Sequence, residues 1–145
     1  MRPDILTGPV LIAEDEENDI FLLRRAFRKS GSGLQPVFVR DGQEAVDYLS
    51  GSAPFEDRLR YPPPALLIID LHMPRMDGFD LLAWLTENRF QIPAVVLTSS
   101  CLQSDVQRAR ELGAAEYLVK PHAFGELERL VHQLLARWPQ PLQIS

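Results

Sequence analysis

The segment ALLIID, residues 65–70, constrains the fold more than any other part of the chain. Five apolar residues without a polar break are typical of a strand covered on both faces, and the run ends on a single carboxylate, Asp70. The turn sequence LHMPRMDG follows at once, and the residues after it have helical spacing. The chain therefore builds a buried strand, presents one aspartate at its end and returns through a helix.

The same strand-then-helix unit occurs five times along the chain. Strands are expected at 9–15, 35–42, 65–70, 93–100 and 116–121, and helices at 16–31, 43–51, 78–88, 104–113 and 124–138, with Ser104 as a plausible N-cap. Right-handed crossovers between such units predict a single α/β domain, in which helices cover both faces of a parallel sheet. Binding sites in these sheets form at the carboxyl ends of the strands.

Charged and polar residues stand at the carboxyl ends of the expected strands. The first strand ends in Glu14 and Asp15, the third in Asp70, the fourth in Thr98 and the fifth in Lys120. In a parallel sheet these ends share one edge, so carboxylates, a hydroxyl and an ammonium are predicted to meet there.

This predicted cluster suits phosphoryl chemistry. Neighbouring carboxylates repel one another unless a cation joins them, and all-oxygen ligands favour Mg²⁺ or Mn²⁺. Which of Glu14, Asp15 and Glu16 would ligate the ion directly stays open, with Asp15 preferred. Lys120 adds a second positive charge, and Asp70 is placed to act as a nucleophile that forms an aspartyl-phosphate.

Composition limits the classes of partner. The chain has 145 residues, a net charge of −5 and one cysteine, Cys101, so neither an intrachain disulfide nor general attraction to nucleic acid or anionic membrane is expected. No apolar run approaches a membrane span, and the first nine residues lack the pattern of a leader peptide. These observations predict a cytoplasmic protein.

The pieces LIAEDEEND, LLIIDLHMPRMDG, VVLTSS and AAEYLVKP, in this order and spacing, resemble the receiver domain of two-component response regulators. The resemblance implies a flavodoxin-like (βα)5 fold with strand order 2-1-3-4-5. It implies that Asp70 is the phosphoacceptor and that a histidine kinase supplies the phosphoryl group. The resemblance further implies a protein that is not a turnover enzyme and is a weak autophosphatase at most.

The resemblance also assigns roles around Asp70. Glu14 and Asp15 would be the acidic pair at the magnesium, with the backbone carbonyl of His72 as a further ligand. Thr98 and Lys120 would sense the phosphoryl oxygens. A cis peptide bond is implied between Lys120 and Pro121.

Finer features point to one subgroup. The Pro-rich insertion at 52–64, the MPRMDG turn and the short tail 139–145 after a core of about 9–138 resemble stand-alone regulators of phytochrome-type histidine kinases. Residues 1–145 are then one receiver domain without an output domain. His72 and His122 depart from the residues usual in this family.

The expected output is a surface change. Tyr117, three residues before Lys120, is either a half-buried strand aromatic or a switch that turns inward as Thr98 moves. The altered surface would comprise the helix at 104–113, the strand at 116–121 and the helix at 124–138, through which the chain could also form a homodimer.

Two other function classes remain open from the sequence. A small phosphatase that uses an aspartyl-phosphate commonly has a second carboxylate two residues after the nucleophile, and this chain has His72 there. A receiver-like binding module that is never phosphorylated usually lacks one of the key residues, and this chain keeps them all.

Overall fold

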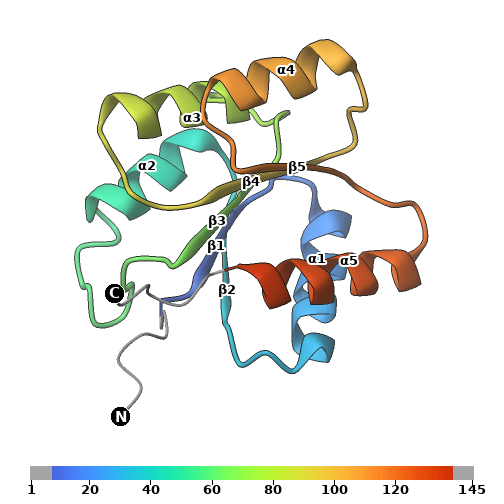
Figure 1. Cartoon of the computed structure of the whole chain (residues 1–145). Coiled ribbons are helices and arrows are strands. Elements are labelled where there is room, and N and C mark those ends of the chain that lie inside the picture. The colour runs from blue at the N-terminus through green and yellow to red at the C-terminus, as the bar shows by residue number, and fades with distance from the viewer. Residues whose placement is uncertain (1–7, 139–145) are drawn as a thin grey trace, which may run out of the picture.

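The computed structural model describes residues 8–138 as one sheet between two layers of helices (Figure 1). Five parallel strands lie in the order β2-β1-β3-β4-β5, as predicted. The strands are β1 (Val10–Ala13), β2 (Pro36–Val39), β3 (Leu66–Ile69), β4 (Ala94–Thr98) and β5 (Glu116–Val119). The helices are α1 (Glu17–Ser30), α2 (Gly42–Ser50), α3 (Gly78–Glu87), α4 (Gln103–Glu111) and α5 (Phe124–Arg137). The predicted tail 139–145 lies outside the described residues.

Each face of the sheet is covered by its own set of helices. Figure 1 shows α1 and α5 against one face and α2, α3 and α4 against the other. Successive residues of β3 point to opposite faces, so Leu66 and Ile68 pack with α1 and α5, while Leu67 and Ile69 pack with α2, α3 and α4. All four are buried, which explains why this strand has no polar residue before Asp70.

Carboxylates cap three of the helices. Glu16 caps α1 by accepting from the backbone N–H of Asp19, and Asp41 caps α2 by accepting from that of Glu44. Asp77 forms a reciprocal capping box with Asp80 at α3. Because each cap directly precedes its helix at the carboxyl edge of the sheet, the helix starts bring acidic residues toward that edge.

Helix α4 starts differently from the prediction. It begins at Gln103 with Leu102 at the N-cap position and without a side-chain cap, so the prediction of Ser104 as cap is wrong. Ser100 lies just before this start, and its hydroxyl donates to Asp105 at 2.6 Å. The loop is therefore tied to the first turn of α4 by a side-chain contact and not by a conventional cap.

Residues 52–64 form an ordered loop between α2 and β3. The rings of Tyr48, Phe55 and Tyr61 pack on one another with centroids 5.0–6.0 Å apart. The Tyr48 hydroxyl donates to the carbonyl of Pro62, and Arg58 donates to the carbonyl of Tyr48, both at 2.8 Å. This loop lies at the amino-terminal side of β3, opposite the predicted site.

No helix within residues 8–138 has the length and apolar character needed to cross a membrane.

Candidate functional site

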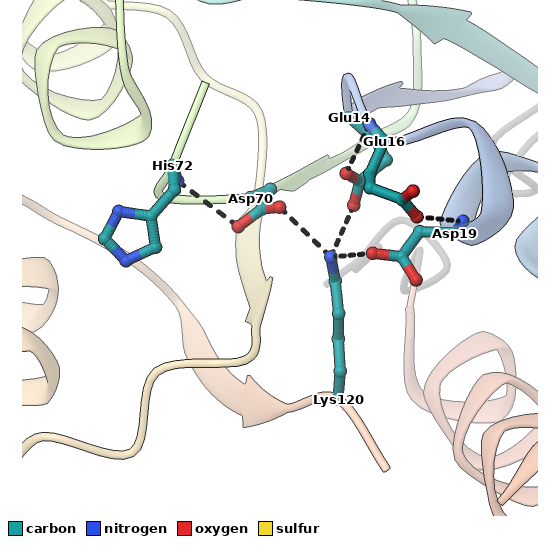
Figure 2. A network of polar contacts seen from close by, with 6 residues as sticks. All are labelled: Glu14, Glu16, Asp19, Asp70, His72 and Lys120. Carbon is teal, nitrogen blue, oxygen red and sulfur yellow. Dashed lines mark hydrogen bonds and ion pairs between the residues drawn. The ribbon is translucent and has the colours of Figure 1, made fainter. Parts of the chain in front are cut away.

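The carboxyl edge of the sheet brings together side chains that are far apart in sequence. Asp70 follows β3, Glu14 follows β1 and Lys120 follows β5, and the backbone N–H of Asp70 donates to the carbonyl of Ala13 at 3.0 Å. Asp70 and Glu14 are both buried, with 8% and 1% of their surfaces exposed. The parallel register thus delivers two carboxylates and an ammonium to one place (Figure 2).

The ammonium of Lys120 is the centre of this arrangement. Its Nζ lies 2.6 Å from Asp19 Oδ2, 2.7 Å from Glu14 Oε1 and 3.0 Å from Asp70 Oδ2. Figure 2 shows the lysine side chain extending from β5 between the three carboxylates. Asp19, in the first turn of α1, was not predicted as a site residue, because no local sequence pattern distinguishes it from the neighbouring acids.

Burial and charge perturb both partners of the Glu14–Lys120 pair. Burial raises the pKa of Glu14 to about 7, against the opposing effect of its hydrogen bond from Lys120. Burial acts to lower the pKa of Lys120, but its hydrogen bonds to Asp19 and Glu14 outweigh this, so the pKa of the lysine lies above its usual value. The lysine is therefore a permanent cation, whereas Glu14 exchanges a proton near neutral pH.

Three carboxylates at this edge are placed to hold a metal ion. Oxygen atoms of Glu14, Asp15 and Asp70 all lie within 4.8 Å of one another. An all-oxygen donor set of three acids fits a hard divalent cation such as Mg²⁺ or Mn²⁺. Glu16, the third acid in the sequence run, instead caps α1 and is exposed.

The residues after Asp70 keep their backbone close to it. The N–H of His72 donates to Asp70 Oδ1 at 3.3 Å, and its imidazole points away from the lysine (Figure 2). Gly78, at the start of α3, donates its N–H to the carbonyl of Leu71 at 3.0 Å. The backbone therefore turns tightly around the aspartate, and the carbonyl of His72 stays a candidate ligand.

An ion pair fastens this loop to the neighbouring helix. Arg75 has a left-handed backbone conformation, with φ 64°, and its Nε donates to Asp41 at 2.8 Å. Nearby, the N–H of Gly42 donates to the carbonyl of Met76 at 2.8 Å. Asp41 is 4% exposed, so the pair anchors the loop on a buried carboxylate. Neither Asp41 nor Arg75 was predicted from the sequence as part of the site.

Thr98 and Tyr117 lie on adjacent strands, β4 and β5. Thr98 is fully buried, and its hydroxyl has no hydrogen-bond partner within the described part of the chain. The Tyr117 hydroxyl donates to the carbonyl of Ser100 at 2.9 Å, in the loop that follows β4. Burial raises the pKa of the Tyr117 hydroxyl. A buried hydroxyl without a partner is costly, which fits a residue whose partner arrives with a ligand.

The prediction of a cis bond between Lys120 and Pro121 is wrong. Within residues 8–138 the cis peptide bond is Ala53–Pro54, in the insertion. Before proline the trans isomer is favoured by only about 0.5–1 kcal/mol, so a Lys-Pro sequence does not by itself determine the isomer. His122, which follows Pro121, is exposed.

Comparison with known proteins identifies the family. The model of the response regulator receiver domain matches residues 10–132. The chain belongs to the response regulator receiver domain family. This receiver domain is 33% identical over 131 residues to "Probable methanogenesis regulatory protein FilR2" of Methanothrix harundinacea, covering 89% of this chain and 82% of that protein. It is 30% identical over 131 residues to "Response regulator Rcp1" of Synechocystis sp., covering 89% and 87%.

Solved receiver structures agree with the fold. The phosphorylated cyanobacterial phytochrome response regulator RcpA superposes with a TM-score of 0.84 at 26% identity, covering 95% of this chain and 100% of that chain. The response regulator RPA3017 in red light signaling of R. palustris superposes with a TM-score of 0.87 at 28% identity, covering 94% and 99%. The Mn²⁺-bound form of Rcp1 superposes with a TM-score of 0.81 at 28% identity, covering 95% and 99%. The predicted flavodoxin-like fold and the membership in two-component signalling are confirmed.

Proposed function

We propose that this receiver domain is a stand-alone response regulator that accepts a phosphoryl group on Asp70 from a histidine kinase in a Mg²⁺-dependent reaction. The observation that carries the proposal is the convergence of Asp70, Glu14 and Lys120, with Lys120 Nζ 3.0 Å from the Asp70 carboxylate. A phosphoacceptor needs a nucleophile, a cation site and a fixed positive charge in one place, and these residues supply all three.

In the proposed transfer, an oxygen of Asp70 forms a bond to the phosphorus of a phosphohistidine. The bond from phosphorus to the histidine nitrogen breaks, and its electron pair stays on that nitrogen, which takes a proton from solvent. Lys120, whose Nζ lies 3.0 Å from Asp70 Oδ2, donates to a phosphoryl oxygen. Glu14, Asp15 and Asp70, with the His72 carbonyl, would hold the metal ion, and its charge would neutralise the transferring oxygens.

The phosphoryl group also offers Thr98 a hydrogen-bond acceptor. We propose that the buried Thr98 hydroxyl then donates to a phosphoryl oxygen, and that the β4–α4 loop and Tyr117 respond. The affected surface comprises α4, β5 and α5, where Leu102 and Val119 are 62% and 43% exposed. Exposed apolar side chains on this surface support a protein contact there, and a homodimer is one form of it.

Sedimentation of the phosphorylated and unphosphorylated protein tests the homodimer. A mass that increases on phosphorylation supports it, and a monomer in both states excludes it.

We propose a phytochrome-type kinase as the partner and the cytoplasm as the location. Support comes from the structural relatives, which include a cyanobacterial phytochrome response regulator and a regulator in red light signaling. The net charge of −5 supports a protein partner over nucleic acid.

Phosphotransfer from an autophosphorylated kinase tests the proposed function. A phytochrome-type kinase and an unrelated histidine kinase are each mixed with wild type or Asp70→Asn, with Mg²⁺ or with a chelator. The proposal expects fast transfer from the phytochrome-type kinase to wild type with Mg²⁺, and none to Asp70→Asn. Equal transfer from both kinases contradicts the partner assignment, and label on Asp70→Asn contradicts the acceptor assignment.

A further inference from the structure

All three hydrogens of the Lys120 ammonium have carboxylate acceptors. An ammonium has three donors and no acceptor, and the contacts to Asp19, Glu14 and Asp70 use one each. The contact to Asp19 is the shortest of the three, at 2.6 Å. Only 13% of the lysine side chain is exposed, so water is not a ready substitute for a missing carboxylate.

Asp19 differs from the other two acceptors in one respect. The carboxylates placed to hold a metal ion are Glu14, Asp15 and Asp70, whereas those that hold Lys120 are Glu14, Asp19 and Asp70. Within residues 8–138, Asp19 is therefore the lysine's only carboxylate partner outside the metal cluster. Asp19 is thus the one of the three carboxylates that neither a bound cation nor a phosphoryl group on Asp70 would need as a ligand.

The local structure fixes Asp19 in place. It is the third residue of α1, and its backbone N–H donates to the capping carboxylate of Glu16 at 2.9 Å. Asp19 and Lys120 line a small cavity of about 30 Å³ together with Pro121 and the leucines at 22, 23, 97 and 127. Because 13% of the Lys120 side chain and 30% of the Asp19 side chain are exposed, the pair is partly shielded from water, which strengthens the attraction between the two charges.

We propose that Asp19 is a positioning residue that holds the Lys120 ammonium toward Asp70 during phosphoryl transfer. The inference rests on the proposed function of Asp70. The lysine side chain is long and flexible, so an anchor that survives metal and phosphoryl binding keeps its charge where the phosphoryl oxygens arrive.

Phosphoryl uptake from acetyl phosphate tests the role of Asp19. Asp19→Ala is expected to lower the rate about tenfold, because a small misplacement of a positioned group has effects of this size or more. Asp19→Asn keeps an acceptor of the same shape, so its rate of phosphoryl uptake is expected to lie between those of wild type and Asp19→Ala. Glu17→Ala is the matched control, because Glu17 lies in the same helical turn, pairs with Arg40 at 2.7 Å and does not touch Lys120. It should react at the wild-type rate.

A second variant shows whether Asp19 acts through the lysine. In a Lys120→Met background, adding Asp19→Ala should change the rate no further. An undiminished effect of Asp19→Ala in that background overturns the proposal, as does an equal loss in Glu17→Ala.

Side-chain NMR of the lysine ammonium groups reads the contact directly. The chain has two lysines, Lys29 and Lys120, so Lys29 serves as an internal reference. In wild type the Lys120 ammonium is expected to exchange its hydrogens slowly with water, and in Asp19→Ala and Asp19→Asn faster, with Lys29 unchanged. A Lys120 signal unaffected by both substitutions refutes the anchor. If wild type takes up no phosphoryl group, the proposed function fails, while the NMR result still decides the contact.

Discussion

Replacing Gly78 by alanine tests how closely α3 must approach the phosphoacceptor. Gly78 is the first residue of α3, and its φ angle is ordinary, so glycine is not required there for its backbone conformation. A Cβ at this position would lie 2.5 Å from the carbonyl oxygen of Asp70, 2.8 Å from Leu71 Cα and 2.9 Å from Ile69 Cγ2. Two of these atoms are backbone, so the strand end itself must move.

The structure sets the size of the expected effect. Normal carbon–oxygen contacts are several tenths of an ångström longer, and overpacking of this kind costs about 1–3 kcal/mol. Alanine favours a helix over glycine by about 0.5–1 kcal/mol, which offsets part of the loss. Gly78→Ala should therefore lower the free energy of unfolding by about 1–2 kcal/mol and, by displacing Asp70, slow phosphoryl uptake.

Gly125→Ala is the matched control for this prediction. Gly125 also lies in the first turn of a helix, α5, and a Cβ there would meet nothing within 4 Å. The same substitution should therefore raise the free energy of unfolding by up to about 1 kcal/mol. Urea unfolding measures both variants, and acetyl phosphate uptake reads the site.

The discriminating result is that the free energy of unfolding falls in Gly78→Ala and rises in Gly125→Ala. If Gly78→Ala unfolds at the same urea concentration as wild type and reacts at the same rate, the close approach of α3 to Asp70 is not a constraint. The reasoning is then refuted.

Three further predictions concern other contacts at the site. Thr98→Val removes a buried hydroxyl without a partner, so it should raise the free energy of unfolding by about 1 kcal/mol and lower phosphoryl occupancy. If urea unfolding shows that the variant is less stable than wild type, the hydroxyl is not unpaired. Because burial raises the pKa of Glu14 from 4.5 to about 7, the folded protein holds an extra proton between these values, so the stability from this group falls as pH rises through that window. Mg²⁺ must displace that proton, so calorimetry should show that Mg²⁺ affinity rises by up to about tenfold from pH 6 to pH 8 in wild type and much less in Glu14→Gln. An equal pH dependence in the two proteins would contradict the raised pKa of Glu14. Asp41→Ala removes a helix cap and the buried partner of Arg75, so it should lower the free energy of unfolding in urea by about 1–2 kcal/mol. Asp41→Asn keeps the cap and should lower it by less. Equal losses of stability in the two variants would assign the whole effect to the ion pair.

Hydrophobic patterning was sufficient to predict a parallel sheet covered by helices on both faces. Uninterrupted apolar runs located the buried strands, and alternation of strand with helix required a parallel sheet. Boundaries were less accurate where no capping residue marks the start: α4 begins at Gln103, ahead of the predicted Ser104 cap, because Leu102 occupies the N-cap position. The strand order came from resemblance to a family and not from periodicity.

The core of the site was also predictable, because strand ends in a parallel sheet share one edge. Asp70, Glu14 and Lys120 meet there as expected. Contacts that depend on the length and direction of individual side chains were not predicted from the sequence. Asp19 is 101 residues from Lys120, and only the direction of the lysine side chain selects it over other acids. The ion pair between Asp41 and Arg75 depends on the left-handed backbone at Arg75, and no local sequence motif predicts that conformation.

Intact-mass analysis after incubation with acetyl phosphate and Mg²⁺ tests the central claim most directly. Wild type should gain the mass of one phosphoryl group, lose it on standing and fail to gain it with a chelator present. Asp70→Asn should gain nothing. No mass gain in wild type, or an equal gain in Asp70→Asn, would contradict the assignment of Asp70 as phosphoacceptor.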